Sequence, residues 1–354
     1  MINKYEIRFF TVGHSSKGGD AIFIRLYDEN DTPFVVVIDG GYSEDGDKII
    51  RYMQDECQLS YIDYVINTHP DIDHISGLLT LFKSDEIKIG KLIMNRPWRD
   101  ANLKSSFFKD GRITENSLNI RLKNSFKKAY DLEQLAIEKI GESNIIHPCI
   151  GNTYLNCFQI LGPSTALYRD QLIASDKTPA VSYFSSLHAT CSKYSIEKYT
   201  GQDIEWFEDE NTSAINETSV ILAFYLLDCM YLFTGDAGKK GLNAALDYYE
   251  SLDENNDSDD FDVIQLPHHG SRKNINPTLL KRINATTYFV SCPPDGLGYG
   301  HYSRRLTNKI LEINPDAQIF ATSGSWLSHC KGIEVEGYAV PKISVNPEMD
   351  GKSI

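Results

Sequence analysis

The chain has 354 residues, of which 41% are hydrophobic and 24% charged, a composition typical of a folded globular protein with one large or two ordinary domains. Its formal net charge of −14 at pH 7 argues against broad binding to DNA. The seven cysteines are odd in number and lack CxxC spacing, which excludes a disulfide scaffold and disfavours a cysteine-built zinc site.

The sequence predicts no membrane-spanning helix, because it contains no run of about eighteen apolar residues. The N-terminal segment carries charges where a secretory signal would be apolar. We therefore expect a cytoplasmic protein with reduced thiols and no membrane partner.

The charge is unevenly distributed along the chain. Residues 83–139 carry thirteen Lys and Arg against eight Asp and Glu, a local charge of +5 that leaves −19 for the rest. Two interpretations fit this stretch: a solvated helical face, or a basic platform beside an acidic site.

Three segments near the N-terminus are apolar or alternating, as β-strands are, and glycine or proline turns separate them: residues 7–12, 21–26 and 34–38. Consecutive strands with short turns predict an antiparallel meander. A helix is expected over residues 43–54, followed by a buried strand over residues 61–66 and a second helix from residue 78.

The segment between that strand and helix packs four potential metal ligands into six residues: His69, Asp71, Asp73 and His74. We place all four on the connecting turn, where their side chains can converge. Carboxylates and imidazoles clustered in this way repel one another or bury poorly without a cation. The alternative for any one of them is an ordinary polar turn with an Asp at the helix N-cap.

A long helix is expected over residues 115–141, and its apolar face is ordinary core. The remaining strands are predicted at residues 91–94, 155–161, 219–227, 230–233, 263–266, 287–291 and 318–322, and further helices at residues 241–249 and 277–283. Residues 250–262 hold seven acids and are interpreted as a solvated loop, because the glycine of a calcium-binding loop is missing. We expect two packed sheets with outer helices, in a single domain over residues 1–354 with insertions at 95–140 and 164–213.

The most polar candidates all share one position, a loop that directly follows an apolar strand. They are Asp39, the cluster at residues 69–74, Asp236, His268, His269 and His301. Functional side chains gather on such loops because the sheet holds them in place while the backbone stays accessible. Each has an ordinary alternative when taken alone, such as a helix cap for Asp236 or a buried imidazole for His268 or His301.

Taken together, the ordered blocks resemble the metallo-β-lactamase superfamily, whose signature H-x-H-x-D-H precedes a distant His, an Asp and a final His. The blocks are Val12-Gly13 with Gly19-Asp-Ala21, Ile38-Asp-Gly-Gly41, His69-Pro-Asp-Ile-Asp-His74, Asn216-Glu-Thr-Ser219, Phe233-Thr-Gly-Asp236, Pro267-His-His-Gly-Ser271 and Gly300-His301. Within the superfamily, they are most similar to the domain found in ComEC-type DNA-uptake proteins. The resemblance covers roughly residues 5–325 and implies an α/β fold, a four-layer αββα sandwich with its site at the edge of the sheets.

Two positions depart from the superfamily pattern. Asp71 stands where the second histidine is usual, and Asn216 stands in place of the third-block histidine. A carboxylate is a harder ligand than imidazole and an amide is a weak one, which shifts the expected metal from Zn²⁺ towards Mn²⁺ or Mg²⁺, although affinity order alone favours Zn²⁺. We expect one or two divalent ions.

The resemblance also implies roles for single residues. It gives His69 and Asp71 to one ion and Asp73 and His74 to the other, with Asp236 between them and His268, or its competitor His269, completing the ligand set. It implies that Asp73 takes a proton, that His301 contacts a metal or the leaving oxygen, and that Asp39 supports a ligand histidine. Asn216 is expected beside the ligands, and His14 stays unassigned.

These expectations lead to a metal-dependent phosphodiesterase, a nuclease that uses a metal-activated water on DNA or RNA. Two alternatives remain open. One is a hydrolase of a small molecule, such as a cyclic nucleotide, lactone or thioester, in a pocket roofed by residues 164–213. The other is a degenerate metal-binding subunit that serves interaction rather than catalysis.

Overall fold

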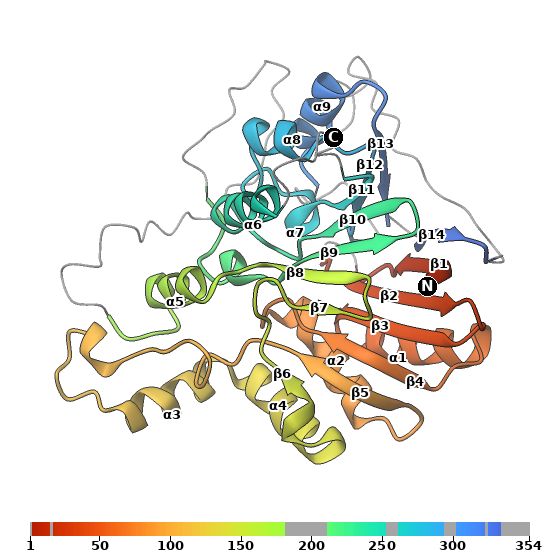
Figure 1. Cartoon of the computed structure of the whole chain (residues 1–354). Coiled ribbons are helices and arrows are strands. Elements are labelled where there is room, and N and C mark those ends of the chain that lie inside the picture. The colour runs from red at the N-terminus through yellow and green to blue at the C-terminus, as the bar shows by residue number, and fades with distance from the viewer. Residues whose placement is uncertain are drawn as a thin grey trace.

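Two seven-stranded sheets lie face to face in the computed structural model, and helices cover the outer face of each (Figure 1). The structure describes residues 2–14, 17–180, 211–252, 261–293, 302–322 and 325–333. This arrangement confirms the predicted αββα sandwich.

The first sheet begins with an antiparallel meander and continues in parallel. β1 pairs with β2 and β2 with β3 in antiparallel register, whereas β3, β4, β5 and β6 run parallel to one another. Its strand order is β14 (Leu327–Lys331), β1 (Ile2–Phe9), β2 (Ala21–Asp28), β3 (Pro33–Gly40), β4 (Tyr61–Ile66), β5 (Lys88–Ile93) and β6 (Ile145–Ile146).

The second sheet shares this mixed design. β7 to β10 pair in antiparallel register, and β10 to β13 run parallel. Its order is β13 (Gln318–Ala321), β12 (Thr287–Val290), β11 (Val263–Gln265), β10 (Cys229–Phe233), β9 (Ile221–Leu226), β8 (Phe158–Gly162) and β7 (Thr153–Tyr154).

Because both faces of each sheet are covered, the strands read as continuous apolar runs rather than as alternating ones. In β3, Val36 and Ile38 face the second sheet, while Val35 and Val37 face the helices on the outside. Successive side chains of a strand point to opposite faces, so every residue of this run is buried.

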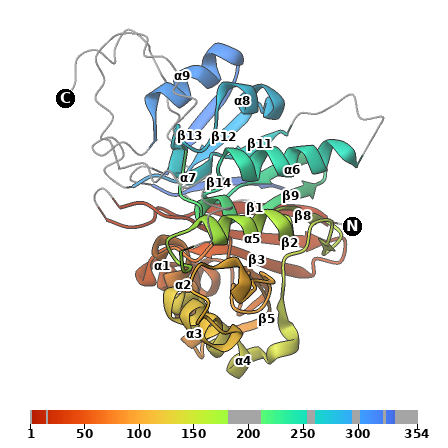
Figure 2. The ribbon, with the colours of Figure 1, turned by 90° about the vertical axis from the view of Figure 1, so that its left-hand side faces the viewer.

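The helices divide between the two outer faces, as the perpendicular view in Figure 2 shows. The first sheet is covered by α1 (Ser43–Arg51), α2 (Ile72–Lys83), α3 (Glu115–Ser125) and α4 (Lys127–Ile140), while α5 (Thr165–Ala174) lies across the edge of the sandwich. The second is covered by α6 (Lys239–Ser251), α8 (Pro277–Ile283) and α9 (Arg304–Ile313). Short helical turns complete the described elements: η1 (Tyr52–Glu56), η2 (Ser105–Phe107), η3 (Glu142–Asn144), η5 (Asn216–Thr218) and α7 (Pro267–Gly270).

Two expectations about elements were wrong, and one strand was missed. The single helix predicted over residues 115–141 is two helices, α3 and α4, because Phe126 leaves the helical conformation (φ −111°, ψ 43°). The helix expected from residue 78 begins at Ile72. Strand β14, which closes the first sheet beside β1, was not foreseen.

The described part of the chain contains no helix with both the length and the apolar character needed to cross a bilayer. Its six cysteines are free thiols. Most of the predicted insertion at 164–213 and of the acidic loop at 250–262 lies outside the described residues.

Candidate metal centre

The loops that carry the candidate ligands meet at one edge of the sandwich. Asp39 lies near the end of β3 and His69 follows β4, and these two strands are parallel neighbours. Asp236 follows β10 and His268 follows β11, which are also parallel neighbours. Carboxyl ends of parallel strands share an edge, so the pairing of strands brings distant segments of the chain together.

Close packing of glycines fixes the start of α2 against this edge. The backbone N–H of Gly77 donates to the carbonyl oxygen of Gly41 at 2.9 Å. A Cβ atom on Gly77 would lie 1.8 Å from the carbonyl oxygen of Gly40, a distance that no side chain tolerates. The absence of a side chain therefore allows the first turn of α2 to lie directly beside Asp39.

The sequence had suggested that all four clustered ligands lie on the turn between β4 and α2. In the structure, only His69 precedes the helix boundary. Asp71 is the N-cap residue of α2, and Asp73 and His74 belong to its first turn. The Asp71 side chain makes no capping hydrogen bond. The ordinary explanation for Asp71, a helix cap, therefore does not account for its carboxylate.

Asp236 lies at the centre of the candidate site, and its two oxygens face different groups of ligands. Its Oδ2 is 3.5 Å from Nε2 of His69 and 3.6 Å from Nε2 of His268. Its Oδ1 is 3.3 Å from Nε2 of His74 and 3.9 Å from Nε2 of His269. One carboxylate thus contacts four imidazoles.

Two further carboxylates lie next to these imidazoles, one on each side of Asp236. Asp71 Oδ2 lies 3.8 Å from Nε2 of His69, on the Oδ2 side of Asp236. Asp73 Oδ2 lies 3.6 Å from Nε2 of His269, on the Oδ1 side. The donor atoms of Asp73, His74 and His269 all lie within 4.8 Å of one another.

The buried donor atoms fit a bound cation. Nε2 of His69, Nε2 of His74 and Oδ1 of Asp236 are buried and have no hydrogen-bond partner among the described residues. Buried polar atoms are nearly always paired, so converging atoms without a partner indicate a ligand that completes them. Nitrogen and carboxylate oxygen donors in this combination suit Zn²⁺ or Mn²⁺.

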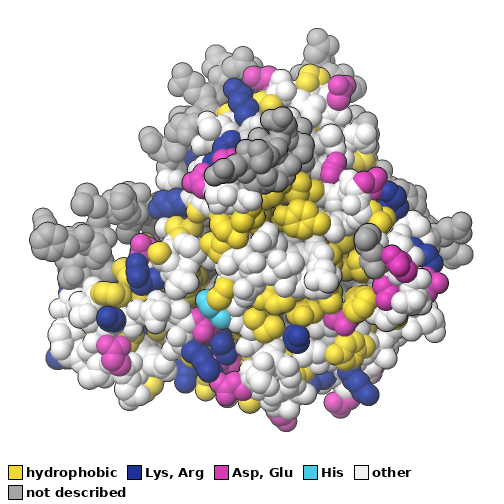
Figure 3. All heavy atoms as spheres, viewed as in Figure 1, with side chains coloured by type: hydrophobic (Ala, Val, Ile, Leu, Met, Phe, Trp, Pro, Cys, Tyr) yellow, Lys and Arg dark blue, Asp and Glu magenta, His cyan; other side chains and the backbone are white. Residues whose placement is uncertain are grey.

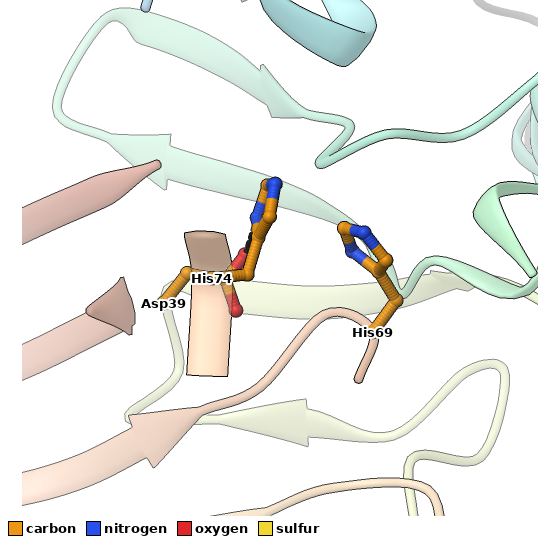
Figure 4. A group of neighbouring side chains, drawn as sticks. All are labelled: Asp39, His69 and His74. Carbon is orange, nitrogen blue, oxygen red and sulfur yellow. Dashed lines mark hydrogen bonds and ion pairs between the residues drawn. The ribbon is translucent and has the colours of Figure 1, made fainter. Parts of the chain in front are cut away.

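Asp39 holds His74 in one orientation, and Figure 4 shows the pair beside His69. Nδ1 of His74 lies 2.8 Å from Oδ2 of Asp39 and donates its proton to this carboxylate, so Nε2 is the atom that would bind a cation. Thr68 donates to Asp39 through its backbone N–H at 2.8 Å and through its hydroxyl at 2.5 Å. Asp39 adopts φ 52°, a strained backbone conformation of the kind found at functional sites.

Asp20 is a member of the site that we did not assign from the sequence. It is 1% exposed, and its carboxylate lies 3.7 Å from Nδ1 of His74 and 3.9 Å from Nδ1 of His269. Its backbone N–H donates to the carbonyl of Asp73. Its signal in the sequence was the block Gly19-Asp-Ala21, which entered the resemblance without a role for the acid.

Asn216 contacts the ligands through its amide nitrogen. Its Nδ2 is 3.3 Å from Oδ2 of Asp236 and 3.3 Å from Nδ1 of His268. Its Oδ1 accepts a hydrogen bond from the Ser213 hydroxyl, away from the carboxylate.

The adjacent histidines reach the site through an unusual backbone. His268 and His269 have φ 48° and 54°, and Gly270 has φ 77°, so three consecutive residues are left-handed. Non-glycine residues rarely adopt this conformation, and it turns both imidazoles towards Asp236. His269 is 2% exposed, whereas 23% of the His268 side chain is accessible.

The acids and imidazoles stabilise one another's charges. Burial disfavours the cation, but Asp236 and Asp73 raise the pKa of His269 to about 9. Burial likewise opposes the charged form of His74, yet Asp236 and Asp39 raise its pKa well above the ordinary value. The histidines in turn lower the pKa values of Asp73 and Asp236 against the effect of burial.

Asp20 behaves differently from the other carboxylates, because burial raises its pKa more than the nearby histidines lower it. The remaining candidates lie elsewhere. His301 is outside the described residues. The exposed His14 pairs with Glu44 at 2.8 Å.

The basic stretch at residues 83–139 is partly paired with acids. Four of its thirteen cations contact nearby carboxylates: Arg96 with Asp100, Arg99 with Glu142, Arg112 with Asp110, and Lys127 with Asp131. Positive and negative side chains are interspersed over this part of the face in Figure 3. These pairs and the interspersed charges favour a solvated surface over a continuous basic platform.

Residues 18–113 match the family model of the metallo-beta-lactamase superfamily. The matched segment includes β2 to β5 and the loop with His69, Asp71 and Asp73. The match covers part of the first sheet, and the αββα fold agrees with a resemblance to this superfamily. No curated protein sequence matches the chain.

Solved structures with similar architecture share little sequence with the chain. A long-form RNase Z from yeast is 10% identical with a TM-score of 0.41, and the match covers 91% of this chain and 41% of the yeast chain. The β-hydroxylase CmlA is 8% identical with a TM-score of 0.44, over 92% and 53% of the two chains. Igni18, a metallo hydrolase from Ignicoccus hospitalis, is 12% identical with a TM-score of 0.40, over 93% and 100%. The chain therefore spans about half or less of the length of the RNase Z and CmlA chains.

Proposed function

We propose that this protein is a metal-dependent phosphodiesterase, a nuclease that hydrolyses nucleic acid. The observation that carries the proposal is the position of Asp236, whose two oxygens each face two imidazoles. Two groups of donors that share one carboxylate are suited to two neighbouring divalent ions. A pair of such ions, when bound, lowers the pKa of water to about 7 and stabilises charge on a phosphoryl group.

The protein's own residues prepare the site for this chemistry. Asp39 fixes the His74 tautomer through its 2.8 Å contact with Nδ1 and leaves Nε2 available. Asp73 combines a lowered pKa with partial exposure, since 29% of its side chain is accessible. The lowered pKa keeps this carboxylate ionised, so we assign Asp73 to ligand binding.

Ligand chemistry supports a phosphate ester as the substrate. Asp71, Asp73 and Asp236 contribute three carboxylates at the two groups of donors, with Asp71 replacing an imidazole. Hard oxygen ligands favour Mn²⁺ or Mg²⁺, ions that commonly assist phosphoryl chemistry.

A small-molecule phosphodiester or other small ester is the second candidate, favoured by the local charge pairing at residues 83–139 and by a narrow pocket. The pocket lies beside His69 and has a largely apolar wall from Phe126, Tyr168 and Leu172. Such a wall suits a flat or apolar group better than an extended phosphate backbone.

The test is a substrate panel with purified protein and Mn²⁺ or Zn²⁺: single-stranded and duplex DNA, RNA, cyclic dinucleotides, a lactone, a thioester and bis-p-nitrophenyl phosphate. We expect phosphodiester hydrolysis that Asp236→Ala reduces at least about a hundredfold, in the range found for removal of charge-stabilising groups. The exposed His14→Ala variant is the matched control. Absence of phosphodiester cleavage in the metal-loaded protein would contradict the proposal.

Salt separates the two candidate substrates. If the substrate is a nucleic-acid polymer, the apparent affinity falls steeply as salt rises, because counterions are released on binding. Turnover of a small phosphodiester changes little over the same range.

A further inference from the structure

The third-block histidine of the superfamily pattern is missing, and the structure shows that Asn216 does not replace it as a ligand. Its Oδ1 is turned to the Ser213 hydroxyl, and its Nδ2 points to Asp236 and His268. An amide NH₂ group donates hydrogen bonds and has no lone pair for a cation. The ion beside His69 and Asp71 would therefore lack one imidazole unless another residue supplies it.

His268 lies where that imidazole is needed. Its Nε2 is 3.6 Å from Oδ2 of Asp236, the same oxygen that lies 3.5 Å from Nε2 of His69. His269 is on the other side, with Nε2 3.9 Å from Oδ1 of Asp236 and 3.6 Å from Asp73. The two adjacent histidines thus lie next to different oxygens of the Asp236 carboxylate.

The side-chain contacts of His268 direct its Nε2 to Asp236. Asn274 is fully buried, and its amide nitrogen donates to the carbonyl of Asp236 at 2.8 Å, which fixes the orientation of the amide. Its Oδ1 lies 3.1 Å from Nδ1 of His268, and the amide nitrogen of Asn216 lies 3.3 Å from the same atom. Nδ1 is thus held between two amides, and Nε2 is the ring nitrogen that faces Oδ2 of Asp236.

We propose that His268 supplies the imidazole that Asn216 lacks, so that His268 completes the ion site of His69 and Asp71 while His269 completes that of Asp73 and His74. The left-handed turn at these residues is what allows neighbouring side chains to serve two ions. The inference rests on the proposed two-ion site and assigns each of its histidines.

Metal content is the direct test and requires no substrate. His268→Gly and His269→Gly form a matched pair, because glycine adopts φ 48° or 54° without strain. We expect the wild type to bind two Mn²⁺ per chain, with the exchange-coupled electron paramagnetic resonance spectrum of a dinuclear site. Each glycine variant should bind one Mn²⁺ and give an uncoupled spectrum, while His14→Ala keeps two.

Rescue identifies which ion each histidine serves. In the double variant Asn216→His with His268→Gly, an imidazole returns beside Oδ2 of Asp236, and we expect the second ion and the coupled spectrum to return. Asn216→His with His269→Gly should stay at one ion. Retention of two ions in His268→Gly at wild-type affinity would overturn the inference, as would equal rescue of both glycine variants.

The outcomes separate this inference from the proposed function. A folded wild type that binds no divalent ion contradicts both. A wild type with two ions and phosphodiesterase activity, in which His268→Gly also keeps two ions, contradicts the inference alone. If His268→Gly does not fold, His268→Asn is measured instead, because asparagine tolerates left-handed φ and should weaken binding of one ion at least about tenfold.

Discussion

At the scale of single residues, the site depends on carboxylates that hold imidazoles in place. Asp39 contacts Nδ1 of His74, and Asp20 lies within 4 Å of Nδ1 of both His74 and His269. The 2.8 Å contact of Asp39 holds the His74 ring so that Nε2 faces Asp236, and Asp20 adds negative charge beside both rings. They explain why strongly buried acids persist beside the ligands.

Asp39→Asn tests this support. The amide keeps the size of the side chain but weakens its acceptance of the His74 Nδ1 proton. We expect Mn²⁺ affinity to fall by about 10–100-fold, as for other residues that orient metal ligands. Isothermal titration calorimetry measures the change, and a wild-type dissociation constant in the variant would refute the assigned role.

Asp20→Asn tests the residue that the sequence did not reveal. Because Asp20 lies against His74 and His269, we expect weaker binding of the ion that those two histidines serve. Asp63→Asn is the control. Asp63 is a half-buried acid of β4 that lies outside the candidate site, and its carboxylate accepts a hydrogen bond from the backbone N–H of Val35 at 2.8 Å. Equal loss of Mn²⁺ affinity in both variants would show a general effect of removing an acid.

At the scale of elements, the first turn of α2 brings Asp73 and His74 to Asp39. This approach requires glycines at the contact, since the backbone of Gly77 touches that of Gly40 and Gly41. The sequence pattern suggested a helix start several residues later, because the ligands themselves interrupt the apolar periodicity. Tertiary contacts extend the helix into the polar segment.

Gly77→Ala tests whether the position of α2 affects metal binding when no candidate ligand is changed. The added methyl group would meet the carbonyl oxygen of Gly40, and we expect a loss of about 1–3 kcal/mol in the free energy of unfolding together with weaker metal binding. Gly111→Ala is the control, because no heavy atom lies within 4 Å of its Cβ position. Urea unfolding gives both values, and equal stability of the two variants would contradict the packing argument.

At the scale of the whole molecule, the two sheets each supply part of the site, so a bound ion links them. Asp39, His69 and His74 come from the first sheet and its helix, while Asp236, His268 and His269 come from the second. Ligands that bind only the folded state stabilise it by mass action.

Removal of the metal should therefore lower the melting temperature. At a free ion concentration of a hundred times the dissociation constant, the ion contributes about 2.7 kcal/mol. We expect chelation to lower the transition by several degrees and added Mn²⁺ to restore it, as differential scanning calorimetry would record. Asp236→Ala should respond much less to either treatment, and a wild type insensitive to chelation would argue against a metal centre.

A second global prediction concerns pH. His329 on β14 contacts the Tyr231 hydroxyl between the sheets, and burial lowers its pKa despite the opposing influence of Asp262. The folded state therefore prefers neutral His329, and its contribution to stability is lost as pH falls from the unfolded pKa of about 6.5 towards the folded value. In His329→Gln, the free energy of unfolding measured with urea should depend less on pH between pH 5 and 8. The same pH dependence in the variant and the wild type would contradict this role of His329.

The strands and most residues of the candidate site were predictable from the sequence, because apolar runs have local periodicity and polar loops follow them directly. Strand β4 and helix α8 were predicted with their observed bounds, and the His69–His74 cluster stood out by composition alone. The break at Phe126 was not predictable, since the apolar spacing continues across it. Strand β14 was missed because its pairing with β1 spans more than three hundred residues.

By itself, the sequence predicted two packed sheets with outer helices and the residue types of the candidate ligands, because periodicity and residue chemistry are local properties, and its resemblance to a family implied the αββα class. Only the tertiary structure decided which donors meet: that Asp20 joins the site, that Asn216 turns its nitrogen to Asp236, and that His268 and His269 face different oxygens of Asp236. These contacts depend on strand pairing and left-handed backbone between segments distant in the chain, which no local pattern encodes.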